Sequence, residues 1–274
     1  MYLLNNIDIS TFGILASQVS GSNIALSGWC DLPIRTGDTH YSWAEEDSVE
    51  PYVDEDDIAF EGRDLVLKAI ILGSNFDLYP KLRDFYAFIA SFTELVTLST
   101  PYGNFEVYVK DVKESHSFAA CELEITFREP VVTINGIIPT SSTIEPYTID
   151  SVPFSAYGLY VNRSSEVYNL PEAKEQFFTK YKKEGYQITK REYRTLTIDG
   201  YVMASSLNDF KTKVANLQYI FSYEGERQIK KNNEIVVTCF AKDGFSISEI
   251  FLLTNSIISK FSISLVITGF DYGN

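Results

Sequence analysis

The sequence has few of the residues from which catalytic and metal sites are usually built. Only two histidines, His40 and His116, occur among 274 residues, and both lie in polar surroundings. There is no G-x-S-x-G elbow, no H-E-x-x-H pair and no glycine loop of the kind that holds phosphate groups. No C-x-x-C or H-x-x-x-H spacing occurs either. We therefore predict no catalytic residue, no cofactor and no metal, and we interpret both histidines as exposed structural residues.

Cysteines and long apolar runs are also scarce. The three cysteines, Cys30, Cys121 and Cys239, are odd in number and far apart, which favours buried, reduced thiols in a protein that folds in a cytosol. No stretch approaches the ~18 uninterrupted apolar residues of a transmembrane helix. Residues 1–6 lack the basic start and the apolar run of a secretory signal. We expect neither a membrane span nor secretion.

Three elements recur in the same order along the chain. The first is a helical stripe with apolar residues at i, i+4, i+7 and i+11, made of Leu78, Leu82, Phe85 and Ile89 and then of Phe210, Val214, Leu217 and Phe221. Before each stripe lies an alternating segment led by Arg63 or Arg194. Each copy closes with an alternating strand, made of Cys121, Leu123, Ile125 and Phe127 and then of Phe261, Ile263, Leu265 and Ile267. Such a duplication supplies two similar surfaces, which favours rings, tubes and scaffolds over a single catalytic cleft.

Most of the remaining segments have the pattern of strands. Alternation over 104–112 follows the turn signal Pro101-Tyr102-Gly103-Asn104, and residues 235–240 follow a similar signal. We also expect a second helix in the later copy over 246–259, where Ile250, Leu253 and Ile257 carry the helical period. A further helical turn or two is expected within 170–183.

Helix starts are marked by residues that accept hydrogen bonds from free backbone N–H groups. Ser74 or Asn75 is expected to cap the first helix, and Ser206 or Asn208 the second. Pro80 is expected in the first turn, where a missing N–H is tolerated. These elements predict a mainly β protein of two tandem related β-sandwich or half-barrel domains, each with a flanking amphipathic helix. The first domain is expected over 1–135, a Pro/Ser/Thr linker over 136–146 and the second domain over 147–274.

The negative charge is concentrated in the first copy. Residues 1–146 contain 8 Lys and Arg against 23 Asp and Glu, whereas residues 147–274 contain 15 against 14, and the whole chain has a net charge of −14. An acidic protein does not bind nucleic acid by neutralising phosphates, but it suits a surface that DNA passes without sticking.

The densest acidic stretch runs from Glu45 to Asp64, and we expect it to be an exposed loop. Its candidate interaction residues are Glu45, Glu46, Asp47, Glu50, Asp54, Glu55, Asp56 and Asp57. A calcium site is the sharper alternative, although the spacing and central glycine of an EF-hand are missing. A glycosidase carboxylate pair is a further alternative that composition alone does not select.

A basic stretch in the second copy interleaves aromatic residues with charge. It consists of residues 180–183, followed by Lys190, Arg191 and Arg194. This pattern is found in nucleic-acid sites, but Glu184 and Glu192 interrupt it, so a solvated edge is the simpler interpretation. A third interpretation is that this edge meets the acidic stretch of a neighbouring chain in a ring.

The element order resembles the tube-forming domain of tailed-phage distal tail proteins and related tail-tube and tail-hub proteins. The shared features are the Arg-led strands over 63–71 and 194–203, the capped amphipathic helix, a turn and a hairpin of alternating strands. The resemblance covers both halves but includes no signature motif. It implies β-sandwiches that assemble into a six-fold ring. The duplication departs from a distal tail protein and is closer to hubs, in which three two-domain chains make a pseudo-six-fold ring.

From this resemblance we expect a non-enzymatic virion component that folds in the bacterial host cytoplasm. It would form a homo-oligomeric ring, a trimer or a hexamer, between the tail tube and the tail tip of a phage or prophage. Its partners would be other tail proteins, and DNA would pass the lumen without specific binding. The alternative is a carbohydrate- or cell-surface-binding module with Trp29, Tyr41 and Trp43 as its platform. A hydrolase that uses the acidic stretch is a third possibility.

Overall fold

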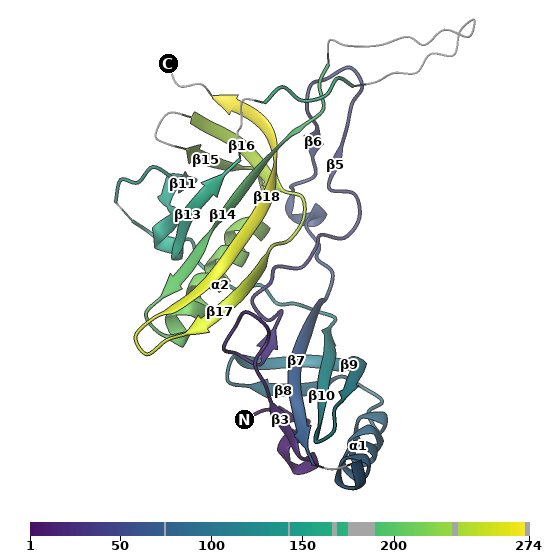
Figure 1. Ribbon diagram of the computed structural model, residues 1–274. Coiled ribbons are helices and arrows are strands. Elements are labelled where there is room, and N and C mark those ends of the chain that lie inside the picture. Colours follow the sequence, from purple (N-terminus) through teal and green to yellow (C-terminus); the bar gives the residue numbers. More distant parts are fainter. Residues whose placement is uncertain (74, 142, 166–168, 175–189, 232–234, 272–274) are drawn as a thin grey trace, which may run out of the picture.

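The protein is built on two eight-stranded sheets that occupy separate lobes (Figure 1). The computed structural model describes residues 1–73, 75–141, 143–165, 169–174, 190–231 and 235–271. Within these residues the chain is mainly β with two α-helices, which confirms the predicted fold class. Neither of these helices is long and apolar enough to cross a membrane.

The first sheet has the strand order β2-β1-β8-β9-β10-β7-β3, with β4 also paired to β7. Its elements are β1 (Leu3–Leu4), β2 (Ile7–Asp8), the 3-10 helix η1 (Ile9–Phe12), β3 (Ile14–Ala16), β4 (Leu26–Ser27), β7 (Arg63–Leu72), α1 (Asn75–Ala90), β8 (Val96–Thr100), β9 (Gly103–His116) and β10 (Ala120–Glu129). All the strand pairs in this sheet are antiparallel.

The second sheet has the order β12-β11-β15-β16-β18-β14-β13, with β17 also paired to β18. Its elements are β11 (Thr148–Ile149), β12 (Val152–Pro153), η3 (Phe154–Tyr157), β13 (Leu159–Ser164), β14 (Arg194–Ala204), α2 (Leu207–Ser222), β15 (Arg227–Lys231), β16 (Ile235–Ala241), β17 (Ser246–Leu252) and β18 (Ile257–Asp271). Element by element, this path repeats that of the first sheet.

The repetition extends to details that the sequence comparison missed. Each unit opens with a two-residue hairpin whose turn has positive φ, Asn5-Asn6 in one and Asp150-Ser151 in the other. Such mirror-image turns match the twist of paired strands. A 3-10 turn follows in each unit and ends at a left-handed glycine, Gly13 or Gly158. The turns that lead into β3 and β13 therefore share an aromatic–Gly–aliphatic sequence, Phe12-Gly13-Ile14 and Tyr157-Gly158-Leu159.

The predicted stripes and closing strands form the cores. The stripe residues of α1 and α2 are buried, except that Ile89 is only partly covered. The alternating residues of β10 and β18 that were singled out are all buried as well. Because successive strand residues point to opposite faces, each sheet buries one face against its helix.

The predicted helix over 246–259 is wrong, because this segment forms β17 and the start of β18. A bulge lies between Ser248 and Phe251, and Glu249 has a φ of 50°. The bulge places the buried residues Ile247 and Ile250 three apart in sequence. Of the residues that suggested a helix, Ile250 belongs to this bulge, Leu253 is exposed in the turn after β17, and Ile257 begins β18. Their spacing therefore does not mark one face of one element.

The helix starts also differ in part from the prediction. The hydroxyl of Ser206 accepts a hydrogen bond from the backbone N–H of Asp209, as expected for a cap. Pro80 lies in the second turn of α1, not the first, because the helix begins at Asn75. Proline lacks the N–H that would bond to the carbonyl of Phe76, four residues earlier in the helix. Ser74 and most of the 170–183 segment lie outside the described residues.

A long excursion of the first half crosses to the second sheet. Residues 28–62, which we call the strap, contain β5 (His40–Tyr41), β6 (Glu50–Pro51) and the 3-10 helix η2 (Glu55–Asp57). Figure 1 shows β5 and β6 beside the upper part of β18, far from β7, into which the strap leads. The acidic stretch therefore lies on the lobe of the second sheet from Glu45 to η2 and returns to the first sheet at its end, where Asp64 belongs to β7.

Candidate functional site: the strap and its seam

The eight predicted interaction residues all lie on the strap, and all are exposed. They come from the loop before β6 and from η2 and its flank. Two of them have side-chain partners: the carboxylate of Glu50 accepts a hydrogen bond from Trp43 Nε1 at 2.6 Å, and that of Asp47 faces the second sheet. The acidic stretch thus has one side whose carboxylates face solvent and another side that bonds to the second unit.

The inward side of the loop forms specific bonds with the second sheet. Asp47 Oδ1 accepts the backbone N–H of Arg191 at 2.7 Å, and Ser48 N donates to the Arg191 carbonyl at 2.9 Å. Ser48 Oγ donates to the Ile267 carbonyl of β18 at 2.8 Å. Lys190 adds a long contact to Asp47 at 3.9 Å. The basic edge that the sequence suggested for a neighbouring chain therefore meets the acidic stretch of its own chain.

A buried lysine, Lys174, bonds to the backbone of the loop before β6. Lys174 is 4% exposed, and its Nζ donates to the carbonyls of Trp43 and Ser48, each at 2.6 Å. Beside it, Val49 packs with Phe240 and Val266 in a small apolar cluster. These contacts hold the acidic side chains at a defined place on the surface. Residues 180–183 of the predicted basic stretch lie outside the described residues.

The lower strap is joined to the second sheet by a backbone bridge. Leu32 and Phe245 exchange hydrogen bonds of 2.9 and 3.1 Å. Asp31 Oδ1 accepts the N–H of Ile247 at 2.8 Å, and Gln218 of α2 donates to the Asp31 carbonyl at 3.0 Å. Burial raises the pKa of Asp31 to about 6, although the Ile247 N–H and the Arg63 charge oppose that shift. We call these contacts between the strap and the second unit the seam. The seam therefore includes a largely buried carboxyl group, whose charged form loses hydration free energy.

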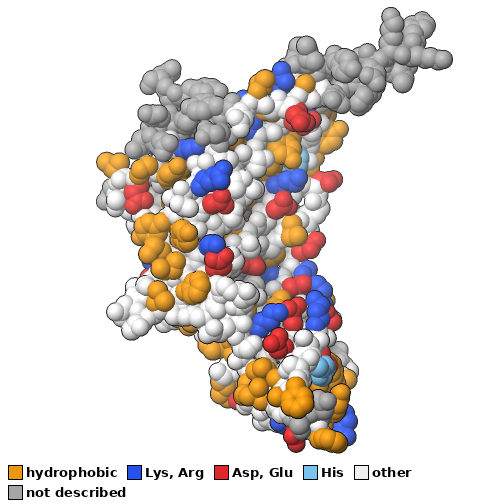
Figure 2. All heavy atoms as spheres, viewed as in Figure 1, with side chains coloured by type: hydrophobic (Ala, Val, Ile, Leu, Met, Phe, Trp, Pro, Cys, Tyr) orange, Lys and Arg blue, Asp and Glu red, His pale blue; other side chains and the backbone are white. Residues whose placement is uncertain are grey.

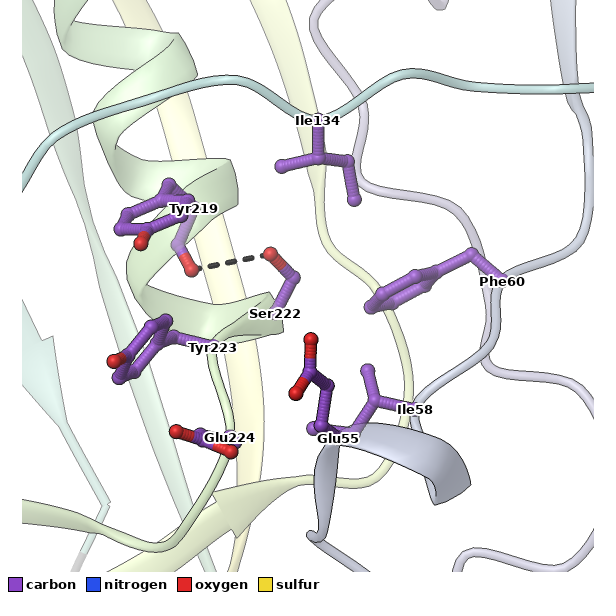
Figure 3. A pocket seen from close by; sticks show the side chains of 8 residues that line it. All are labelled: Glu55, Ile58, Phe60, Ile134, Tyr219, Ser222, Tyr223 and Glu224. Atoms are coloured by element: carbon purple, nitrogen blue, oxygen red, sulfur yellow. Dashed lines mark hydrogen bonds between the residues drawn. The ribbon is translucent and has the colours of Figure 1, made fainter.

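A pocket of about 420 Å³ lies along the upper seam. Figure 3 shows side chains from three sources around it: Glu55, Ile58 and Phe60 of the strap, Ile134 of the segment that follows β10, and Tyr219, Ser222, Tyr223 and Glu224 at the end of α2. Ser222 Oγ donates to the Tyr219 carbonyl at 3.1 Å, so the hydroxyl is occupied within the helix. The pocket combines apolar walls with two carboxylates and has no nucleophile–base pair.

The outer faces of the two sheets differ in charge. On the first, Lys110 and Arg128 pair with Asp64 at 2.6 and 2.9 Å, and Lys68 pairs with Glu124. On the second, Thr197 and Ser264 form a hydroxyl pair at 3.2 Å. Figure 2 shows clustered charges over the lower lobe and a largely uncharged area over the middle of the molecule. The repeated fold therefore presents two different surfaces.

Exposed aromatic residues at the far end of the first unit escaped the sequence analysis. Phe118 in the β9–β10 turn is 100% exposed and Phe76 at the start of α1 is 92% exposed, with Leu72 and Tyr79 nearby in sequence and also exposed. At the helix position of Phe76 the second unit has Asn208. Phe76 lies outside the buried stripe of its helix. An apolar residue outside the stripe is the sequence signal that could have predicted this exposed surface. We call Leu72, Phe76, Tyr79 and Phe118 the aromatic tip.

The remaining sequence predictions for this surface have mixed outcomes. Trp29 is buried, so it is wrong as a sugar platform, while Tyr41 and Trp43 are exposed with ring centroids 4.5 Å apart and planes tilted by 56°. His40 is half-buried, with its ring against those of Tyr193 and Phe240 and its Nδ1 at 3.1 Å from the Thr39 hydroxyl. Within the described residues the acidic stretch brings no three potential metal ligands together.

The three cysteines are buried and free, as predicted. Burial raises the pKa of each thiol, so each is a neutral S–H group at ordinary pH. Cys30 and Cys239 lie within the apolar core. Cys121 differs in having a histidine and a glutamate close by.

Among known proteins, no family model and no curated protein matches this chain. Among solved structures, the chain is similar to the crystal structure of the SPP1 Dit (gp 19.1) protein, described as a paradigm of the hub adsorption apparatus in Gram-positive infecting phages. That similarity covers 96% of this chain and 98% of the other, at 14% identity and a TM-score of 0.35.

Proposed function

We propose that this protein is a non-enzymatic structural component of a phage or prophage tail, a ring-forming adaptor between the tail tube and the tail tip. The observation that supports it most is the repetition of one strand path, with one helix on each sheet, within a single chain. Two related units joined by a bonded seam present two related but unequal surfaces. Contacts between unlike surfaces of successive chains generate closed rings when the rotation between the chains closes.

The acidic side of the strap is proposed to face the lumen or a neighbouring tail protein. It concentrates carboxylates on a loop that is held in place by Lys174 and Ser48. Clustered negative charge repels DNA phosphates, which suits a passage that DNA traverses without binding. The proposal also includes two domains, the first over residues 1–135 and the second over residues 147–274.

Charge reversal of Glu45, Glu46 and Asp56 to lysine tests this role. Asp47 is left unchanged, because it anchors the loop through Arg191 N. We expect native folding by circular dichroism, impaired assembly, and new DNA binding at low salt that fades as salt rises. The matched control replaces the same three residues with glutamine. Unchanged assembly together with no DNA binding by the lysine variant would contradict the proposed role of the strap.

The aromatic tip is proposed as a contact between copies or with a neighbouring tail protein. Two nearly fully exposed phenylalanines at one end of a unit have no role in its core. Replacing both Phe76 and Phe118 with serine is expected to weaken self-association at least tenfold, since each buried aromatic anchor contributes on the order of 1–2 kcal/mol. Sedimentation velocity over a concentration series measures this. Ile144→Ser, at an equally exposed position in the linker, is the control, and equal self-association of both variants would refute the contact between copies.

A further inference from the structure

A compact cluster of potential metal ligands lies at the end of the β9–β10 hairpin. Cys121 and His116 are directly paired across the two strands, and Glu114 lies two residues before His116 on the same face of β9. One ligand atom from each side chain, the Cys121 Sγ, a His116 nitrogen and a Glu114 carboxylate oxygen, falls within 4.8 Å of the other two. Among the described residues this is the group that brings three such atoms together.

The distances suit a single ion. Cys121 Sγ lies 3.9 Å from His116 Nε2, and the same nitrogen lies 2.8 Å from Glu114 Oε2. Zinc binds thiolate sulfur at about 2.3 Å and imidazole nitrogen at about 2.0 Å, so two such ligands of one ion lie up to about 4.3 Å apart. The sulfur–nitrogen distance therefore needs no change, and the histidine–glutamate hydrogen bond opens slightly to admit the ion.

The surroundings of the cluster resemble an outer ligand shell. The hydroxyl of Tyr86 on α1 donates to the other carboxylate oxygen of Glu114, which orients it. The ring of Tyr79 on the same helix lies 6.2 Å from that of His116. Glu114 and His116 are partly open to solvent, whereas Cys121 is fully buried. Entry is thus from the solvent side, and one coordination position stays open.

The second unit shows that the fold itself does not need these polar groups. Cys121 pairs with Ile71 of β7, and the matching residue of β14, Val202, pairs with Ser259. In the second unit the place of Cys121 is therefore taken by Ser259, which is fully buried and lies opposite the bulge of β17. The first unit has at this place a thiol, an imidazole and a carboxylate, which is the donor set that borderline-soft divalent ions prefer.

We propose that Glu114, His116 and Cys121 bind a divalent transition-metal ion of the zinc class. Binding replaces the Cys121 thiol proton, which is released to solvent, and leaves His116 with its proton on Nδ1. One thiolate and one carboxylate then neutralise the two positive charges. Hard ions such as calcium are disfavoured, because two of the three ligands are sulfur and nitrogen. The site is independent of the proposed tail function.

Titration of the reduced, metal-free full chain with Co²⁺ tests the site. We expect a thiolate-to-cobalt absorption band that saturates at one ion per chain and that Zn²⁺ abolishes. Cys121→Ser is expected to lose the band, and His116→Ala to weaken binding at least about tenfold. Cys239→Ser is the matched control, because that thiol is equally buried and donates to the Arg227 carbonyl.

Folding of the variants is checked by circular dichroism. Because His116→Ala changes an exposed side chain, the His116→Ala variant still tests the site if Cys121→Ser unfolds. Zn²⁺ is expected to raise the melting temperature of the unaltered chain and of Cys239→Ser, but not of His116→Ala. Absence of a saturable band in the unaltered chain, or an equal band in His116→Ala, would overturn the proposal.

Discussion

Replacing Trp29 with alanine is expected to lower the free energy of unfolding by about 3–5 kcal/mol. Trp29 is 6% exposed and lies where the two units meet. Its ring stacks on Tyr102 at 4.9 Å with an 11° angle between planes, and meets Phe210 of α2 edge-on at 5.9 Å. Removing it opens a cavity at the junction and breaks two aromatic contacts. Urea unfolding followed by far-ultraviolet circular dichroism measures the loss.

Two further variants sharpen this expectation. Trp29→Phe should recover much of the loss, because it keeps a ring and removes an indole N–H that finds no partner among the described residues. Trp43→Ala is the matched control, since the Trp43 side chain is exposed and its indole N–H donates to the exposed Glu50, and it should cost less than about 1 kcal/mol. Equal losses for Trp29→Ala and Trp43→Ala would show that Trp29 does not join the units.

Replacing Gly244 with alanine is expected to separate the strap from the second sheet or to prevent stable folding. A Cβ at this glycine would lie 1.8 Å from the Leu32 carbonyl oxygen and 2.3 Å from that of Pro33. Both atoms are backbone, so the clash is relieved only if the Leu32–Phe245 bridge opens. The expected loss is at least about 3 kcal/mol, as for severe overpacking. Limited proteolysis should then cut the strap between residues 35 and 62.

A second glycine provides the control for this change. At Gly269 in β18 a Cβ would meet Thr238 at 3.5 Å, which is ordinary contact. Gly269→Ala should therefore leave the melting temperature and the proteolysis pattern nearly unchanged. If Gly244→Ala behaved in the same way, the bridge between the strap and β17 would be wrong.

The sequence was sufficient to predict the parts of the fold that repeat locally. The stripe from Phe210 to Phe221 and the closing strand from Phe261 to Ile267 bury the residues that their periods select. Periodicity succeeds there because one regular element faces one core. It fails over 246–259, because Ile250, Leu253 and Ile257 belong to a bulge, a turn and the next strand and share a helical spacing without sharing an element.

The seam was beyond prediction for a different reason. Its bonds join residues far apart in sequence, such as Ser48 with Ile267 and Asp31 with Ile247. A single polar residue in a loop carries no periodic signal of its distant partner. The same holds for Trp29, whose neighbours Tyr102 and Phe210 are brought together only by the fold. The acidic stretch was recognised as exposed, but its anchored side was not.

Cross-strand pairing also hid the proposed metal site. Glu114 and His116 are two residues apart, and Cys121 follows five residues later, a spacing that matches no familiar metal motif. The hairpin register places the thiol opposite the imidazole. A search for ligands across predicted hairpins, in place of a search for linear motifs, would have found it.

The molar mass of the assembled protein tests the central claim most directly. Light scattering on a sizing column, with negative-stain images of the same peak, gives the number of 31.0 kDa chains and their symmetry. We predict closed rings of three chains with a six-fold outline, since each chain would supply two related units to the ring wall. A monomer at every concentration that also fails to form rings with neighbouring tail proteins would contradict the account.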